Sequence, residues 1–236
     1  MSADTPQDYS GTAVAAPTSF LQKHIWVLAA VVGVVCITLL QLCQGRTLQK
    51  LPVVYVLPEF SLTDQRGETF GSKDLDGKVW VASFIFTSCQ TECPAIGRAN
   101  QVLQERLAGT GVELVSFSVD PEYDTPQLLG EWGVKFGVDP ARWHLLTGDR
   151  KKIEALVIDG FRTHMGDKAM SGGLVQIAHT MKLVLVDQRR GIRHYFDALD
   201  DKAVALVVDH AKAITQDEGD GAPAAAPARA PGGNAP

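Results

Sequence analysis

Residues 79–94, VWVASFIFTSCQTECP, carry the strongest fold signal in the chain. The run from 79 to 86 is apolar and rich in β-branched and aromatic residues, which is typical of a strand covered on both faces. Pro94 can open a helix, and apolar residues recur after it at helical spacing until Gly109. Cys89 and Cys93 therefore lie where a buried strand ends and a helix begins.

Strands and helices are predicted to alternate along the rest of residues 56–215. Apolar runs predict the strands, and capping residues followed by apolar residues at helical spacing predict the helices. We expect strands at 112–119, 143–146, 181–186 and 192–196, and helices from 126 to about 137, from 149 to 160 and from 200 or 201 to 214. This order predicts an α/β fold with a central mixed sheet flanked by helices.

Residues 25–42, IWVLAAVVGVVCITLLQL, contain no charged side chain. As a helix they would span roughly 27 Å, close to the thickness of the hydrocarbon layer, so we predict one transmembrane anchor. A cleaved signal peptide is less favoured, because the run is long and no A-x-A site follows. Lipidation at Cys36 or Cys43 is also less favoured, because a bulky residue precedes each cysteine.

The remaining segments are assigned from composition. We expect a flexible tail at 1–24, a linker at 43–55 and a disordered tail rich in Pro, Ala and Gly at 216–236. The net charge of −5 gives no general attraction for nucleic acid, so we exclude that class of partner. Four cysteines among 236 residues are too few for a fold built on disulfides, so a hydrophobic core must hold the domain.

The C-x3-C spacing of Cys89 and Cys93 favours joint chemistry of the two sulfurs. A helix N-terminus favours the thiolate form, which is both the nucleophile and the metal ligand. The pair could form a disulfide or bind one metal ion, and the alternative is two small buried side chains. Two cysteines make an incomplete zinc site, whereas two thiolates and one imidazole suit copper. Among the histidines, His179 is the candidate third ligand, because it follows a loop containing glycines and precedes a strong predicted strand.

Five segments, in order, resemble the Sco/SenC family of copper-binding, thioredoxin-like, membrane-anchored proteins over about residues 56–214. They are 58–67 (PEFSLTDQRG), 84–94 with its C-x3-C-P motif, 118–126 (SVDPEYDTP), 143–149 (WHLLTGD) and His179 before its strand. This sequence has Gln90 and Thr91 where family members often have Pro and Asp, and Ala178 where many have Asp. These departures leave all three candidate ligands in place and change their surroundings.

The resemblance implies that Cys89, Cys93 and His179 bind one copper ion, as Cu(I), Cu(II) or both. It also implies a metallochaperone that helps assemble the CuA site in subunit II of cytochrome c oxidase. The anchor would then hold the domain on the periplasmic side of a bacterial inner membrane, as a single-pass protein. In a eukaryote the location would be the mitochondrial intermembrane space.

A second hypothesis is a thiol-disulfide oxidoreductase that uses Cys89 and Cys93 to keep a partner's cysteines reduced. This enzyme chemistry needs only two nearby thiols and an accessible thiolate. Its activity would not depend on His179, whereas copper binding would. The sequence leaves copper delivery, cysteine reduction and copper sensing open, and a peroxidase is disfavoured because no threonine lies three residues before Cys89.

Overall fold

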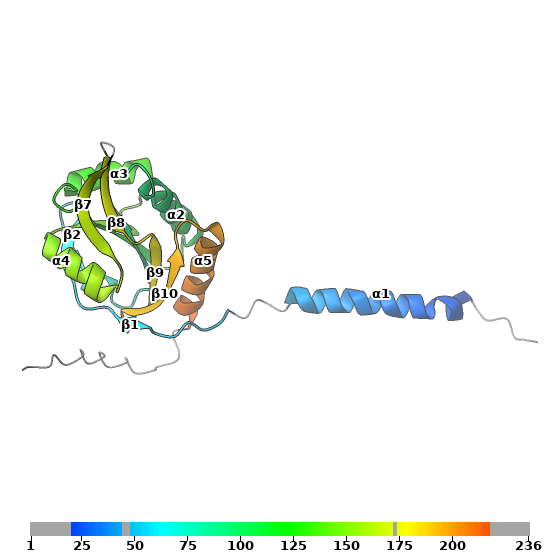
Figure 1. Ribbon diagram of the computed structural model, residues 1–236. Coiled ribbons are helices and arrows are strands. Elements are labelled where there is room, and N and C mark those ends of the chain that lie inside the picture. Colours follow the sequence, from blue (N-terminus) through cyan, green and yellow to red (C-terminus); the bar gives the residue numbers. More distant parts are fainter. Residues whose placement is uncertain (1–19, 44–47, 172–173, 218–236) are drawn as a thin grey trace, which may run out of the picture. The chain divides into compact units, whose positions relative to one another are not determined.

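The computed structural model describes residues 20–43, 48–171 and 174–217 in two compact units, 1–47 and 48–236 (Figure 1). The described part of the first unit is a helix, Phe20–Cys43 (α1), and the exposed side chains along it are mostly apolar. Nowhere in the described ranges is a helix found whose length and apolarity suit a membrane crossing. The anchor expected at 25–42 is therefore not confirmed. Most of the predicted N-terminal tail, part of the linker and nearly all of the C-terminal tail lie outside the described residues.

The second unit is built on an eight-stranded sheet with the order β1-β10-β9-β4-β5-β6-β2-β3. Its strands are Tyr55–Val56 (β1), Ser61–Asp64 (β2), Thr69–Gly71 (β3), Trp80–Ile85 (β4), Glu113–Ser118 (β5), Trp143–Thr147 (β6), Lys182–Val186 (β9) and Gly191–Asp197 (β10). The central strands β4, β5 and β6 are parallel, and the other pairings are antiparallel. The expected mixed sheet is confirmed. Every residue of β4, β5 and β6 is buried, which explains the continuous apolar runs in the sequence.

Four α-helices and two shorter helical turns accompany these strands in the described part of the unit, and the last helix follows the last strand. They are Ser72–Leu75 (η1), Cys93–Arg106 (α2), Pro126–Lys135 (α3), Arg150–Ala155 (α4), the π-helical turn Leu156–Gly160 (η2) and Asp201–Gln216 (α5). Proline lies in the first turn of α2 and α3, as the sequence predicts. The helix expected at 149–160 is divided between α4 and η2.

Helices cover both faces of the sheet. Asn100 of α2 donates a hydrogen bond to the hydroxyl of Ser83 on β4, at 3.0 Å. The next residue of β4, Phe84, contacts Phe161, which follows η2 directly. Because successive side chains of a strand point to opposite faces, α2 and the end of η2 lie on opposite sides of the sheet.

Phe161 is the centre of a buried aromatic cluster on the η2 side. Its ring lies 6.1 Å from that of Trp80, 5.1 Å from Phe84 and 5.3 Å from Phe117, measured between ring centroids. All four side chains are fully buried. The cluster therefore joins β4 and β5 to the segment after η2, and fixes the two strands whose ends carry the candidate site.

The largest departure from the prediction is a separate two-stranded sheet of Met165–Ser171 (β7) and Leu174–His179 (β8). The sequence predicted a loop with glycines at 171–173 and a strand from 181, and assigned no strand between 161 and 180. Figure 1 shows β7 and β8 as two long antiparallel strands side by side. The two strands were not predicted because their sequence is polar, and it is the backbone pairing between them that stabilises the hairpin. Most of the loop predicted at 171–173 lies outside the described residues. His179 is consequently the last residue of β8, and β9 begins at Lys182.

We expect Phe161→Ala to lower the free energy of unfolding by about 3–5 kcal/mol, because it removes the ring that the cluster surrounds. Urea unfolding followed by tryptophan fluorescence measures the change. Val134→Ala is the matched control: Val134 is 82% exposed, so its truncation should change the free energy by less than about 0.5 kcal/mol. Equal effects of the two substitutions would contradict the central place of Phe161 in the core.

Candidate metal centre

The two cysteines lie in the turn between β4 and α2. The N–H of Cys89 donates to the carbonyl of Phe86 at 3.2 Å, which closes the turn after the strand, and α2 begins at Cys93. The two side chains are 8% and 0% exposed, respectively, and both are free thiols. The C-x3-C segment thus holds both sulfurs beyond the carboxyl end of a buried parallel strand, where α/β sheets commonly place reactive groups.

Each sulfur receives a backbone donor. The N–H of Cys93 lies 3.4 Å from Sγ of Cys89, and the N–H of Phe86 lies 3.5 Å from Sγ of Cys93. The hydrogen bond from the Cys93 thiol, aided by His179, lowers the pKa of Cys89 to about 3 despite partial burial. The same hydrogen bond, together with burial, raises the pKa of Cys93. The pair is therefore a thiolate at Cys89 that accepts a hydrogen bond from a neutral thiol at Cys93.

His179 brings a third donor to this pair from β8. Its Nε2 lies 3.7 Å from Sγ of Cys93, and its Nδ1 lies 2.9 Å from the carbonyl oxygen of Thr180. A carbonyl only accepts hydrogen bonds, so Nδ1 carries a proton, and Nε2 is the ring nitrogen that faces the cysteine sulfurs. The ring of Phe86 packs edge-on against the imidazole, at 5.6 Å between centroids. The imidazole is therefore oriented from both sides.

The chemistry of the donors fits a soft metal ion. Two sulfurs and one imidazole nitrogen suit Cu(I), which prefers sulfur. The 3.7 Å between the Cys93 sulfur and the His179 nitrogen is close to the spacing of two ligands about 2.0–2.3 Å from one ion. In the ranges that the structure describes, however, no group of three His, Cys, Asp or Glu side chains has the arrangement of a metal-ion site. The three-ligand set therefore stays a prediction.

Asp124 fixes the turn that precedes the cysteines. Its buried carboxylate accepts hydrogen bonds from the Thr87 N–H at 3.2 and 3.1 Å, from the Thr87 hydroxyl, and from the Ser118 hydroxyl at 2.6 Å. Burial raises the pKa of this carboxyl group. The cap of the next helix is Thr125, as its sequence predicts: its hydroxyl accepts from the N–H of Leu128. The sequence could have indicated the role of Asp124, because this residue follows β5, the parallel neighbour of the strand β4 that precedes the cysteines.

The residues that depart from the family pattern surround this centre. Gln90 and Thr91 are exposed, and so is Ala178. The Thr91 hydroxyl lies 3.6 Å from Sγ of Cys89 and also forms a hydrogen bond with Glu92. Thr91 therefore supplies a polar contact to the thiolate.

His144, another histidine, lies far from the thiols in the sheet. Its Nε2 lies 3.1 Å from Oε2 of Glu113. Glu113 is the first residue of β5, so this pair lies at the end of the parallel strands opposite the cysteines.

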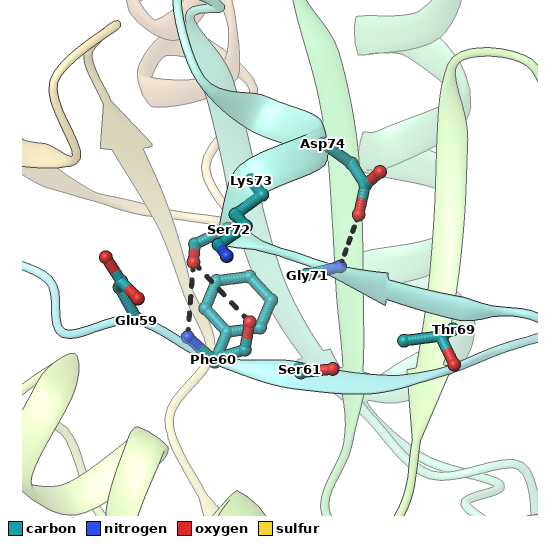
Figure 2. A pocket seen from close by; sticks show the side chains of 8 residues that line it. All are labelled: Glu59, Phe60, Ser61, Thr69, Gly71, Ser72, Lys73 and Asp74. Atoms are coloured by element: carbon teal, nitrogen blue, oxygen red, sulfur yellow. Dashed lines mark hydrogen bonds between the residues drawn. The ribbon is translucent and has the colours of Figure 1, made fainter.

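A cavity of about 550 Å³ lies elsewhere, between the β2–β3 hairpin and η1 (Figure 2). None of the candidate ligands lines it. Its polar groups bind one another: the Phe60 N–H donates to the Ser72 hydroxyl, and the Gly71 N–H donates to Asp74. The cavity is therefore separate from the thiol chemistry, and nothing in it points to a ligand.

A family model described as SCO1/SenC matches residues 50–215. Among curated proteins, the SCO1 protein homolog of Bacillus subtilis is 33% identical over 123 residues, which are 51% of this chain and 63% of that protein. The match to the SCO2-like proteins of Rickettsia typhi and Rickettsia felis covers 50% of each of those proteins. The chain thus matches about half to two thirds of the length of these relatives.

Solved structures give the same result. A SCO1/SenC family lipoprotein from Bacillus anthracis is 34% identical with a TM-score of 0.64, over 69% of this chain and 96% of that one. Bradyrhizobium japonicum ScoI with copper bound is 26% identical with a TM-score of 0.57, over 66% and 99%. BsSco, described with a disulfide switch and as a member of a family of cytochrome c oxidase assembly proteins, is 27% identical with a TM-score of 0.59, over 70% and 98%. These likenesses support the thioredoxin-like α/β fold.

The thiol–thiolate pair predicts selective alkylation. Brief iodoacetamide treatment of the reduced chain at about pH 6, below the pKa near 8.5 of an ordinary thiol, should modify Cys89 and leave Cys93 intact. Peptide mapping by mass spectrometry reads each site. Cys93→Ala should raise the pKa of Cys89, because it removes the hydrogen bond that stabilises the thiolate. Modification of Cys93 before Cys89 would contradict this assignment.

The Asp124 contacts predict a loss of stability. Asp124→Asn should lower the free energy of unfolding by about 1–3 kcal/mol, because the amide has one acceptor oxygen for donors that now share two. Glu122→Gln, on the exposed part of the same loop, is the control and should change little. Urea unfolding of both variants measures the difference, and equal stability of the Asn variant and the unsubstituted chain would refute the role of Asp124.

Proposed function

Because the chain belongs to the SCO1/SenC family, we propose that it binds copper and takes part in the assembly of cytochrome c oxidase. One copper ion would be held by Cys89, Cys93 and His179. The observation that carries this proposal is the 3.7 Å approach of Nε2 of His179 to the Cys93 sulfur, beside the Cys89 thiolate. The copper bound by the Bradyrhizobium relative supports the same cargo.

Each donor would contribute differently. Cys89 is already a thiolate, whereas Cys93 must lose its proton on binding, so loading releases a proton. His179 supplies a neutral donor whose direction is set by Thr180 and Phe86. The burial of both sulfurs limits the access of water, while the exposed Gln90 and Thr91 leave one side of the centre open to a partner's sulfurs. Such a site can pass Cu(I) on by exchange of sulfur ligands.

The proposed partner is the copper-binding subunit II of the oxidase, and the proposed role is that of a metallochaperone for its CuA site. We place the protein at the periplasmic side of an inner membrane, held by one apolar segment at residues 25–42. The description of the Bacillus anthracis relative as a lipoprotein supports an association with a membrane. The partner and this location rest on the family and on the sequence.

A thiol-disulfide oxidoreductase is the second candidate. The observation that favours it is the pairing of a low-pKa thiolate with a neutral neighbouring thiol, which is the arrangement of an attacking and a resolving cysteine. The disulfide switch described for BsSco supports such a role. The two functions are compatible, because binding of Cu(I) requires both cysteines reduced.

Anaerobic titration with Cu(I) tests the copper site. The reduced chain should bind one copper, and His179→Ala should weaken binding by more than about 100-fold, beyond the loss typical of residues that only support a ligand. His194→Ala, at an exposed position on β10, is the matched control and should bind normally. Metal analysis and competition with a chelator give the stoichiometry and the affinity. Normal binding by His179→Ala, with reversible Cys89–Cys93 oxidation, would favour the oxidoreductase instead.

A further inference from the structure

The position of His179 depends on a hairpin that is not part of the main sheet. In the described part of the chain, β7 pairs only with β8, and His179 is the last residue of β8. The cysteines, by contrast, are fixed to β4 and α2 in the main sheet and its helices. The His179 nitrogen can meet the sulfurs only if other contacts hold the hairpin against the carboxyl ends of the central strands.

One ion pair makes such a contact. Nζ of Lys168 on β7 lies 2.7 Å from Oδ2 of Asp120, just after β5. The side chain of Asp120 is 0% exposed and that of Lys168 is 35% exposed. The other carboxylate oxygen, Oδ1, has no hydrogen-bond partner among the described residues. Lys168 is therefore the group that compensates a buried negative charge, and loss of such a partner is strongly unfavourable.

The register of the hairpin couples this lysine to His179. Lys168 is opposite Ile177 in the antiparallel pair, and directly opposite residues project from the same face. Ile177 and His179 are two residues apart on β8, so their side chains also share a face. Ile177 is 5% exposed and packs in the core. The face of the hairpin that packs against the domain thus carries Lys168, Ile177 and His179 together.

The loop that receives the lysine also holds the cysteine turn. The carbonyl of Asp120 accepts the N–H groups of Tyr123 and Asp124, which closes the loop into a turn. Asp124 holds Thr87, two residues before Cys89. Tyr123 lies under the same lysine, with Nζ 5.5 Å from the ring centroid, in the geometry of a cation–π contact. A single rigid loop is therefore connected to both segments that carry the candidate ligands.

We propose that the Lys168–Asp120 ion pair is a latch that positions His179 next to Cys93. Lys168 and Asp120 are positioning residues, because they touch neither sulfur nor imidazole in the contacts described above. This inference deepens the proposed copper function and rests on it for its purpose. The latch itself is a property of the copper-free chain, which makes it testable separately.

The test is hydrogen exchange of the copper-free full-length chain, resolved by peptide. Lys168→Met should speed exchange of the β8 amides by at least about tenfold, while exchange of β4 and β5 stays unchanged, because the hairpin opens locally. Lys168→Arg, which keeps the charge, should restore most of the protection. Asp167→Asn is the matched control: Asp167 also lies on β7, its side chain is fully exposed, and loss of its ion pair with Arg150 of α4 should leave exchange unchanged.

Copper affinity provides the second measurement. In Lys168→Met we expect one copper per chain with an affinity reduced by about 10–100-fold, as for residues that orient a ligand. Unchanged exchange of β8 in Lys168→Met overturns the latch, as does equal loosening in Asp167→Asn. Should the unsubstituted chain bind no copper while the latch variants still loosen β8, the proposed function fails and the latch stands. Asp120→Asn, which preserves the shape of the side chain, should loosen β8 in the same way as Lys168→Met.

Discussion

The parallel pairing of β4 with β5 is the constraint on which the candidate site depends. It sets Ile85 opposite Ser118, so the cysteine turn and the loop that contains Asp120 and Asp124 leave the sheet at the same point. Hydrogen bonds to the Asp124 carboxylate then join the two exits. If either segment moved away, the buried Asp124 carboxylate would lose hydrogen-bond donors, which is energetically unfavourable. These contacts therefore hold the cysteine turn in place without a metal ion or a partner.

The thiol pair adds an electrostatic constraint to this base. Two thiolates side by side in a buried turn would repel each other, and the structure avoids this by sharing one proton between Cys89 and Cys93. A soft cation bound by both sulfurs would replace the shared proton and remove the reason for keeping one sulfur neutral. On the proposed function, the proton and the metal ion would thus be alternative occupants of the space between the sulfurs.

Much of the central architecture could be predicted because it depends on local patterns. The apolar runs gave the parallel strands, and Thr125, Pro126 and Asp200 marked the helix starts, since caps and apolar spacing are written in neighbouring residues. The position of Cys89 and Cys93 between a buried strand and a helix was predicted from the same local patterns. His179 was picked out from its loop and from the family resemblance, and the structure places it beside Cys93. Its three-ligand role stays a prediction.

What could not be predicted depends on contacts between distant residues. The β7–β8 hairpin has a polar sequence around two glycines, so its stability comes from pairing and from a few buried side chains such as Ile177. The partner of Asp120 is 48 residues away, and no periodicity reveals it. The local sequence does not reveal the roles of Asp120 and Asp124, because aspartate commonly forms turns and helix caps. Only the fold shows that they face the cysteine turn and the hairpin.

The two outer strands of the sheet are short, with two residues in β1 and three in β3. Such strands offer few unpaired backbone groups to another chain, which blunts the tendency of open sheets to add strands from neighbours and aggregate. The long, continuous strands are all kept in the interior of the sheet. At β1 and β3, therefore, the addition of a strand from another chain is disfavoured.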